Sequence, residues 1–353
     1  MRIASIVGAR PQFIKAALLS KELRRIGTEV LINTGQHYDL NMSDIFFKQL
    51  SLKADMDLQV GSGTHAAQTA RMLEAIDAAL MEVQPDLVIV YGDTNTTLSA
   101  VLVASKRTIP IAHVEAGLRI FDLSVPEEVN RVVSDHLSDI LFAPTAHAMN
   151  MLKNEGLGER SYLVGDVMVE LLRKNMHKLS RKYIERLGLS EGGYVLCTIH
   201  RQDNVDVKKN LNSIFKGLTD SEKRILLPLH PRTRKKVEEF GLERAIGKNI
   251  MIVEPVGYIE MLSMMRFAEK VCTDSGGVQK EAFLLKRPCI TLRTGTEWVE
   301  TKRAGWNLLV GTDPRRISKA ISRFEPSKKW KDVYPISDSA KRICKILRSK
   351  MNG

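Results

Sequence analysis

The sequence alternates short apolar runs with helix-length segments along its whole length, and this alternation restricts the fold more than any other feature. Residues 87–90 (LVIV) and 109–112 (IPIA) are typical of buried strands, and a helix-length segment separates them. Strands that are buried on both faces read as continuous apolar runs, as in parallel sheets. The alternation therefore predicts an α/β fold in which helices cover both faces of parallel sheets.

Two series of this kind follow one another in the 353 residues, which are more than one average domain requires. We predict two Rossmann-like, doubly wound domains facing a cleft, residues 1–170 and 171–336, with a last helix at about 337–350 packing back on the first domain. Expected strands lie at 3–7, 30–32, 87–90, 109–112, 140–142 and 162–164, then at 194–199, 224–229, 250–253, 270–273, 289–292 and 307–310. Expected helices include 42–50, 66–83, 96–106, 126–137, 259–267 and 276–285.

Composition places the chain among ordinary folded proteins, with 44% hydrophobic and 27% charged residues. No apolar run approaches the roughly 18 residues that a membrane span requires, and the chain starts in a strand without the pattern of a signal peptide. We therefore expect a cytoplasmic protein without a membrane segment. The four cysteines are scattered and the histidines lack zinc-ligand spacing, so we expect buried, reduced thiols and no metal site.

The formal net charge of +12 favours an anionic partner. Basic clusters lie at 232–236, 328–329 and 341–350, but aromatic residues do not alternate with them and no nucleic-acid motif accompanies them. Solvated helix faces explain these clusters better than nucleic-acid binding does. A small phosphate-bearing substrate would use only a few of the charges.

Three acids lie close together in residues 91–131, which contain YGDTNTT, HVEAGLR and PEEVNR in that order. Each acid follows an expected strand or begins an expected helix, and ligands of parallel sheets meet the carboxyl ends of the strands. Taken alone, Asp93 is better explained as a helix cap and Glu127 as an ordinary acid in a first helical turn.

The third acid, Glu115, has no such explanation. It stands between apolar residues just before a glycine, and an acid in that setting requires a partner. His113 and Arg119 are the partners that the local sequence offers. On local physics, Glu115 is therefore the strongest candidate for an active-site acid.

Two strand-to-helix turns are suited to phosphate. At residues 8–11 (GARP), free backbone N–H groups and the positive end of a helix favour an anion, and Arg10 and Lys15 add charge. A plain turn with Pro11 at the start of the helix explains the sequence equally well. The turn is neither GxGxxG nor a Walker loop, so we expect no nicotinamide, flavin or ATP cofactor.

The second turn is residues 273–277 (TDSGG), where a strand ends and a helix begins with glycines. Its exposed backbone N–H groups would suit a diphosphate, and Glu281 one turn later could accept hydrogen bonds from ribose hydroxyls. The alternative is that Ser275 caps the helix, and the two roles are compatible.

Histidines end two further strands of the second series. His200, followed by Arg201, ends the strand at 194–199, and His230 ends the strand at 224–229. Each is weak evidence alone, but both would face the same cleft as the acids.

Taken in order, these motifs resemble the non-hydrolysing UDP-N-acetylglucosamine 2-epimerase family. The resemblance covers nearly the whole chain, and the GDT, HVEAGLR and DSGG blocks at their separations are its most specific part. The matching motifs are GARPQFIK (8–15), TGQH (34–37), YGDTNTT (91–97), HVEAGLR (113–119), PEEVNR (126–131), TIHR (198–201), LHP (229–231), TDSGGVQKEA (273–282) and TEWVE (296–300).

The resemblance implies the glycosyltransferase-B fold and the interconversion of UDP-GlcNAc and UDP-ManNAc, without NAD or metal, for surface polysaccharide or glycan synthesis. UDP would leave C1 by anti-elimination as C2 loses its proton. It would then add back to 2-acetamidoglucal after a proton returns to the opposite face of C2. Members of the family are usually homodimers, and in bacterial members a second UDP-GlcNAc activates the enzyme.

By motif, the resemblance assigns catalytic roles to four residues: Asp93, Glu115, Glu127 and His200. It assigns substrate binding to Arg10, Lys15, Arg119, Arg201, His230, Ser275, Gly276, Gly277, Glu281 and Glu297. The activating UDP-GlcNAc would bind near Gln36, His37 and Arg71.

Two departures from the family pattern lie beside the expected position of the sugar. Trp298 stands where many bacterial members have a substrate-contacting arginine, for which Arg293 or Arg303 can compensate, and the segment 120–125 is shorter. The alternatives therefore include the same reaction on a modified sugar such as a UDP-2,3-diacetamido-uronic acid. A retaining glycosyltransferase of the same fold, a hydrolysing epimerase and a non-enzymatic nucleic-acid binder are the others.

Overall fold

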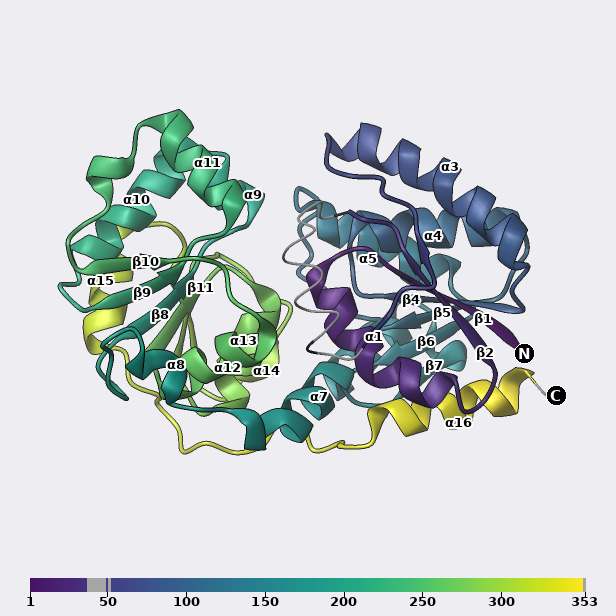
Figure 1. The fold of residues 1–353 in the computed structure, drawn as a ribbon. Helices are drawn as coiled ribbons and strands as arrows, with labels where there is room; N and C mark the ends of the chain where they lie inside the picture. The colour runs from purple at the N-terminus through teal and green to yellow at the C-terminus, as the bar shows by residue number, and fades with distance from the viewer. Residues whose placement is uncertain (37–48, 50–51, 352–353) are drawn as a thin grey trace. The chain divides into compact units, whose positions relative to one another are not determined.

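The computed structural model describes residues 1–36, 49 and 52–351, and the chain divides into two compact units (Figure 1). The first unit comprises Met1–Lys174 and Tyr334–Gly353, and the second comprises Asn175–Val333. The candidate His37 and, apart from Gln49, the expected helix at 42–50 lie outside the described residues.

The first unit is built on a sheet that has seven strands in the described part of the chain, in the order β3-β2-β1-β4-β5-β6-β7. Every neighbouring pair is parallel. The strands are β1 (Arg2–Val7), β2 (Thr28–Asn33), β3 (Met56–Asp57), β4 (Leu87–Tyr91), β5 (Ile111–Val114), β6 (Ile140–Ala143) and β7 (Ser161–Leu163).

Helices cover this sheet on both faces (Figure 1). α3 and α4 pack apolar side chains against alternate strand residues such as Ile6 and Val88, and α16 packs against α1. The last helix therefore belongs to the first unit. The described helices are α1 (Arg10–Leu23), α3 (His65–Val83), α4 (Asn95–Lys106), α5 (Pro126–Leu137), α6 (Ala146–Asn154), α7 (Val167–Asn175) and α16 (Ser339–Met351), with a 3₁₀ turn at Gly158–Arg160.

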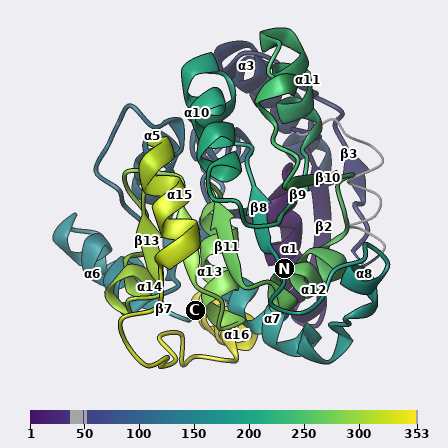
Figure 2. The same ribbon diagram turned by 90° about the vertical axis from the view of Figure 1, so that its left-hand side faces the viewer.

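The second unit has a parallel sheet of six strands in the order β10-β9-β8-β11-β12-β13. α10 and α15 lie side by side (Figure 2). They bury Phe215 and Ile317 against β8 and β9. The strands are β8 (Val195–Thr198), β9 (Ile225–Pro228), β10 (Ile250–Val253), β11 (Lys270–Thr273), β12 (Cys289–Thr291) and β13 (Asn307–Leu309). The helices are α8 (Lys182–Glu185), α9 (Gln202–Val205), α10 (Lys208–Thr219), α11 (Pro231–Phe240), α12 (Tyr258–Phe267), α13 (Gly276–Leu284), α14 (Val299–Arg303) and α15 (Pro314–Arg323), with 3₁₀ turns at Met176–Lys178 and Glu243–Ala245.

The two sheets share one strand order, and this confirms the predicted α/β class with parallel sheets. In each sheet the order reverses once, between β1 and β4 in the first and between β8 and β11 in the second. Ligands of open α/β sheets bind at the carboxyl ends of the strands that flank such a reversal. The turns after these four strands are therefore the places where a site is expected.

Most predicted strand bounds agree with the structure to within one or two residues. The strand at 109–112 is displaced to β5, which brings His113 into the sheet and sets Glu115 directly after it. β3 was not predicted, because two residues at a sheet edge carry too little apolar pattern. α6 was not predicted either.

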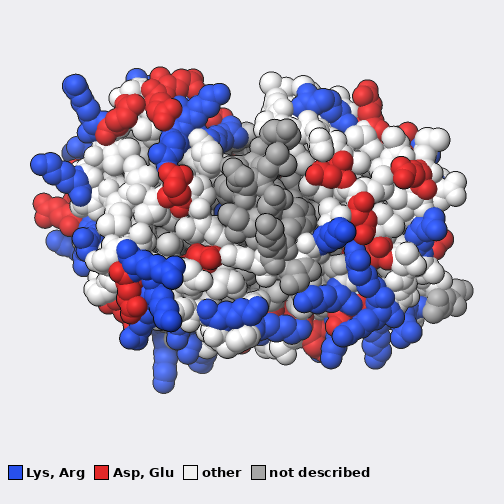
Figure 3. Space-filling view, in the orientation of Figure 1, with Lys and Arg blue, Asp and Glu red and all other residues white. Residues whose placement is uncertain are grey.

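The surface charges, the cysteines and the helices of the structure can each be compared with the expectations from composition. On the face of each unit seen in Figure 3, Lys and Arg side chains are interspersed with Asp and Glu side chains. All four cysteines are free and buried, as expected for structural thiols. Among the described helices, none combines the length and apolar character that crossing a membrane requires.

Gly117, which follows β5, offers a test of the local fold. Its φ is +83°, and a Cβ there would lie 2.4 Å from the Ala148 carbonyl oxygen. We expect Gly117→Ala to lower the free energy of unfolding by about 2–4 kcal/mol, because it adds a backbone clash to the cost of left-handed φ. Gly156→Ala is the matched control, since its φ is +77° and a Cβ would meet nothing within 4 Å. Urea denaturation of both variants decides, and equal losses would contradict the steric explanation.

Candidate active site

The turn after β1 is closed by a side chain of α1. The N–H groups of Gly8 and Ala9 donate to Gln12 Oε1 at 2.8 and 3.1 Å. Gln12 is fully buried, and its Nε2 donates to the Tyr91 carbonyl at 2.9 Å. The expectation that these two N–H groups are free for phosphate is wrong, because Gln12 occupies them. Arg10, the first residue of α1, remains the candidate anion ligand of this turn.

Lys15 of α1 is the partner of Glu115. Its Nζ lies 2.8 Å from Glu115 Oε1, and the two side chains are only 5% and 9% exposed. The prediction that His113 or Arg119 partners this acid is therefore wrong. Glu115 has a φ of +74°, a left-handed conformation that costs a non-glycine residue about 1–3 kcal/mol and is concentrated at active sites.

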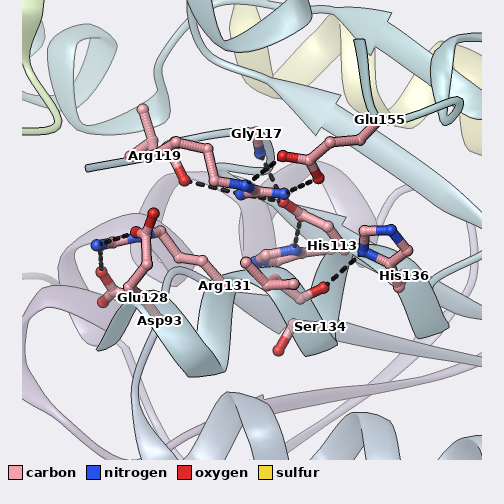
Figure 4. Close-up of polar contacts among 12 residues, drawn as sticks. Asp93, His113, Gly117, Arg119, Glu128, Arg131, Ser134, His136 and Glu155 are labelled. Atoms are coloured by element: carbon pink, nitrogen blue, oxygen red, sulfur yellow. Dashed lines mark hydrogen bonds and ion pairs between the residues drawn. The ribbon is translucent and has the colours of Figure 1, made fainter. Parts of the chain in front are cut away.

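Asp93 follows β4 and pairs with Arg131 of α5, whose Nη1 lies 2.5 Å from Asp93 Oδ2 (Figure 4). The alternative that Asp93 caps α4 is wrong, because Thr94 is the N-cap and accepts a hydrogen bond from Thr97. Although 30% of the Asp93 side chain is exposed, desolvation raises its pKa, and the charge of Arg131 opposes this shift while that of Glu127 reinforces it.

The three predicted acids lie in one charged neighbourhood of the first unit. Desolvation is the largest cause of the raised pKa of Asp93. The charges of Glu127 and Glu115 also raise this pKa, and the charge of Lys15 lowers it. Carboxylates that act on one another in this way, with cations among them, are typical of acid–base sites. The first unit therefore brings together three of the four residues assigned to catalysis.

His113 is fully buried in β5 and lies between two oxygen atoms. Its Nδ1 is 2.7 Å from Asp135 Oδ1, and its Nε2 is 2.7 Å from the Gly92 carbonyl oxygen. Burial alone would raise the pKa of Asp135, but the hydrogen bond and charge of His113 and the charge of Arg119 outweigh it and lower the pKa. An ionised carboxylate and a carbonyl accept hydrogen bonds, so each ring nitrogen of His113 faces an acceptor.

Arg119 completes this buried group. Its Nη1 lies 2.7 Å from Asp135 Oδ2, and its Nε and Nη2 donate to Glu155 at 2.8 and 2.6 Å. Arg119 thus pairs with two carboxylates beside the turn that carries Asp93. Only 3% of Arg119 is exposed. This geometry favours a structural role for Arg119 over the predicted role in substrate binding.

In the second unit, Asp274 organises the turn after β8. Its fully buried carboxylate accepts hydrogen bonds from the N–H groups of His200 and Arg201 at 3.1 and 3.0 Å and from Asn204 Nδ2 at 3.1 Å. His200 Nδ1 lies 3.5 Å from Asp274 Oδ1. Because β8 and β11 are neighbours, an acid at the end of one strand orients the candidate histidine at the end of the other.

His230 lies beside His200, with 6.1 Å between the ring centroids. His230 is the N-cap of α11, and its Nδ1 accepts a hydrogen bond from the N–H of Arg232 at 3.2 Å. Its Nδ1 therefore carries no hydrogen, and Nε2 is the nitrogen that can donate to a ligand.

The TDSGG turn begins α13 with Gly276 and Gly277. A Cβ on Gly276 would lie 2.1 Å from Glu297 Oε1, so the missing side chain is what lets this carboxylate approach the helix end. Arg293 Nη1 in turn lies 2.9 Å from Glu297 Oε2. Ser275 makes no capping hydrogen bond with its side chain, so capping does not account for this serine.

Trp298 is buried against the same helix. The Lys280 Nζ lies 3.8 Å from the centre of the Trp298 ring system, and the two residues are 0% and 2% exposed. A buried cation–π contact of this kind fastens the segment around Trp298 to α13. Glu281, next to Lys280, is 5% exposed.

Gln36 and Arg71, assigned to a second nucleotide site, both bind local elements of the first unit. Gln36 Oε1 accepts hydrogen bonds from Thr96 N–H and Oγ1 at 3.1 and 2.9 Å. Arg71 donates to the carbonyl oxygens of Val60 and Ser62 at 3.3 and 2.9 Å. These contacts fix the loops at the start of α3 and α4.

Sequence reasoning gave no role to three buried residues, Gln12, Asp135 and Asp274. The last two are acids, which are almost never fully buried without partners, so each would have been suspect had its burial been known. Asp135 is fully buried, but in the sequence it reads as one polar residue of an amphipathic helix. Asp274 belongs to the TDSGG motif, but the functional interpretation of that motif rested on its serine and glycines.

Two parallel sheets of this order define a protein of the glycosyltransferase-B class. A family model described as UDP-N-acetylglucosamine 2-epimerase matches residues 21–348. The chain therefore belongs to the UDP-N-acetylglucosamine 2-epimerase family.

Relatives of known description agree with this membership. A Methanococcus maripaludis protein described as a UDP-N-acetylglucosamine 2-epimerase homolog is 48% identical over 99% of this chain and 100% of its own length. A Pseudomonas aeruginosa UDP-2,3-diacetamido-2,3-dideoxy-D-glucuronate 2-epimerase is 45% identical over 88% of each chain. The crystal structure of Methanocaldococcus jannaschii UDP-GlcNAc 2-epimerase with UDP-GlcNAc and UDP is similar with a TM-score of 0.93, at 42% identity over 99% of this chain and 100% of that one.

The raised pKa of Asp93 predicts a pH dependence of stability. The folded state favours the protonated form of Asp93, so protonation at low pH stabilises the fold. This contribution is lost as the pH rises from the pKa of Asp93 in the unfolded chain, about 3.9, through its higher pKa in the folded protein. Asp93→Asn stays neutral, and should therefore gain stability relative to the wild type across that window. Urea denaturation over a pH series measures the difference.

Asp135→Asn is the contrasting control. The pKa of Asp135 is lowered, so its contribution is present at neutral pH and is lost only as pH falls. This variant should therefore be the less stable one at pH 7, since it removes the carboxylate that pairs with the buried Arg119. A stability difference between Asp93→Asn and the wild type that falls with rising pH would contradict the assignment.

Proposed function

We propose that this protein interconverts UDP-GlcNAc and UDP-ManNAc by inverting C2, through elimination of UDP and its re-addition to 2-acetamidoglucal. The observation that carries this proposal is the grouping of Asp93, Glu115 and Glu127 with cations in the first unit. Inversion at a carbon next to the leaving group requires proton transfer on both faces, and one residue cannot easily serve both. The family membership of the chain supports the same reaction.

The proton-transfer steps require acids in different environments. Desolvation raises the pKa of Asp93, which brings this acid closer to the working pH than an exposed carboxyl group would be. Glu115 is ion-paired with Lys15, which favours its charged form and suits a base. The charge of Glu127 raises the pKa of Asp93. We therefore assign Glu127 to the same acid–base set.

The leaving diphosphate gains negative charge in the transition state and requires donors that are already in place. We assign its binding to Arg10 of the first unit and to the start of α13 in the second, with Ser275, Gly276 and Gly277, and the ribose to Glu281. His200, held by Asp274, lies at the adjacent strand end and joins the catalytic set. Arg201, His230 and Glu297 complete the proposed substrate contacts.

The same reaction on a modified sugar is the second candidate function. A relative at 45% identity is described as an epimerase of a UDP-2,3-diacetamido-2,3-dideoxy-D-glucuronate. We further propose a cytoplasmic homodimer that supplies activated ManNAc for a surface polysaccharide or glycan. A second UDP-GlcNAc near Gln36, His37 and Arg71 would act as an activator.

Solvent exchange tests the reaction directly. Incubation of the protein with UDP-GlcNAc in D2O should give UDP-ManNAc that carries deuterium at C2. ¹H NMR follows this reaction. Asp93→Asn should lower exchange by roughly 10²–10⁴-fold while UDP still binds, because one proton-transfer group is lost. Asp77→Asn, which removes an acid that pairs with Arg107 on the surface, is the control and should keep full activity. Transfer of the sugar to an added acceptor without exchange at C2 would replace the epimerase by a glycosyltransferase. Parallel incubation with a UDP-2,3-diacetamido-uronic acid decides the sugar.

UDP binding tests the role of α13. A Cβ on Gly276 collides with Glu297 and covers the helix N-terminus, so Gly276→Ala should weaken UDP binding by about tenfold or more in calorimetry. Gly295→Ala is the matched control, because a Cβ there meets nothing within 4 Å. UDP binding by Gly276→Ala at wild-type affinity would place the diphosphate elsewhere.

A further inference from the structure

Glu128 of α5 contacts two parts of the first unit, the loop 120–125 and the side chain of Arg131. Its side chain is 1% exposed. Oε1 accepts hydrogen bonds from the N–H groups of Ile120 and Phe121 at 2.9 and 2.7 Å. Oε2 lies 2.9 Å from Arg131 Nε and 2.7 Å from Arg131 Nη2. One carboxylate therefore binds both the loop 120–125 and the arginine that holds Asp93.

Arg131 transmits this contact to Asp93. Its side chain is 2% exposed, and its Nη1 reaches Asp93 Oδ2 at 2.5 Å while its Nε and Nη2 face Glu128. The neighbouring Asn130 donates to the Asp93 carbonyl oxygen at 2.9 Å. The first two turns of α5 thus fix both the backbone and the carboxylate of Asp93.

The loop that Glu128 binds is strained. Phe121 has a φ of +59°, which is uncommon for a residue of this size. Its side chain is 76% exposed and that of Leu123 is 70% exposed, so packing of these side chains does not hold the loop. Strained backbone persists only where its surroundings determine it. The two backbone hydrogen bonds to Glu128 Oε1 hold the loop in this conformation.

We propose that Glu128 is a positioning residue for the reaction, setting the carboxylate of Asp93 through Arg131 and the conformation of loop 120–125 with the same side chain. This proposal rests on the proposed function for its effect on turnover. Glu128 itself does not touch Asp93 in any described contact, and acts through Arg131. Substrate-dependent changes in the loop would therefore reach Asp93 by way of one carboxylate.

A carboxylate is required at this position, because all four atoms that bind Glu128 are donors. Glutamine has one acceptor oxygen and one donor nitrogen. If its oxygen faces Ile120 and Phe121, its NH₂ group opposes the N–H groups of Arg131. If it is flipped, the NH₂ group opposes the two backbone N–H groups. Glu128→Gln therefore loses either the arginine or the loop.

The test measures epimerisation kinetics and backbone amide exchange of Glu128→Gln, Glu128→Ala and Arg131→Lys in the full chain. Misplacing an acid by about 1 Å costs up to about 100-fold in rate. We expect kcat to fall about tenfold to 100-fold in all three, with KM within about twofold. Amide exchange at Ile120 and Phe121 should accelerate in Glu128→Ala and stay slow in Arg131→Lys.

Glu170→Gln is the matched control. Glu170 is also buried, with one oxygen accepting from the Ala340 N–H at 3.1 Å and the other 2.7 Å from Lys174 Nζ. The same amide substitution there should leave kcat within about twofold, so a general cost of losing a buried carboxylate is separated from a loss of position.

Several results would overturn the proposal. A kcat of Glu128→Gln within twofold of the wild type would do so, as would unchanged amide exchange in Glu128→Ala. If Glu128→Gln does not fold, Arg131→Lys decides, and wild-type turnover there counts against Glu128.

If the wild type does not epimerise UDP-GlcNAc, the proposed function fails, and ¹³C NMR titration of Asp93 decides the positioning role. Asp93 faces Arg131 and Glu127 from α5, Lys15 from α1 and Glu115 after β5. A titration that is the same in the wild type, Glu128→Gln and Arg131→Lys would then refute it.

Discussion

The proposed acid–base site of the first unit depends on placing carboxylates beside buried cationic side chains. A buried charge without a partner costs several kcal/mol, so isolated acids at these strand ends would be lost to neutralisation or unfolding. Lys15 supports Glu115, Arg131 supports Asp93, and His113 with Arg119 supports Asp135. The cationic partners come from α1, from α5 and from the loop after β5, so the helices that cover the sheet also supply positive charge beside these acids.

The second unit uses the same principle with backbone donors in place of cations. Asp274 is fully buried and accepts three hydrogen bonds from the turn that carries His200. A carboxylate that gathers N–H groups in this way orders the turn without adding a positive charge beside the diphosphate position. Glu297 lies beside Arg293 and the start of α13. The first unit therefore compensates these buried acids mainly with cationic side chains, and the second compensates Asp274 with N–H groups.

The fold could be read from the sequence because strand burial is local: β10 is an apolar run whose bounds the pattern predicts without error. The motif order selected Asp93, Glu115 and Glu127, which the structure brings into one charged neighbourhood. The partners could not be predicted, because Lys15 reaches Glu115 only after β1 and β4 pair, and no local pattern reports that contact. Gln12 shows the converse error, since a glycine-containing turn before a helix indicates an anion site only if no side chain already binds its N–H groups.

Two residues of the first unit combine a strained backbone with a contact to a buried charged side chain. Glu115 and Phe121 both have left-handed backbones, and each is held by a buried charged side chain from a helix, Lys15 for the first and Glu128 for the second. Such conformations cost free energy unless neighbouring groups fix them. If Lys15 moved to a leaving diphosphate during turnover, Glu115 would lose the contact that favours its charged form. The departure of UDP and the protonation of this acid would then be coupled, because one lysine serves both anions.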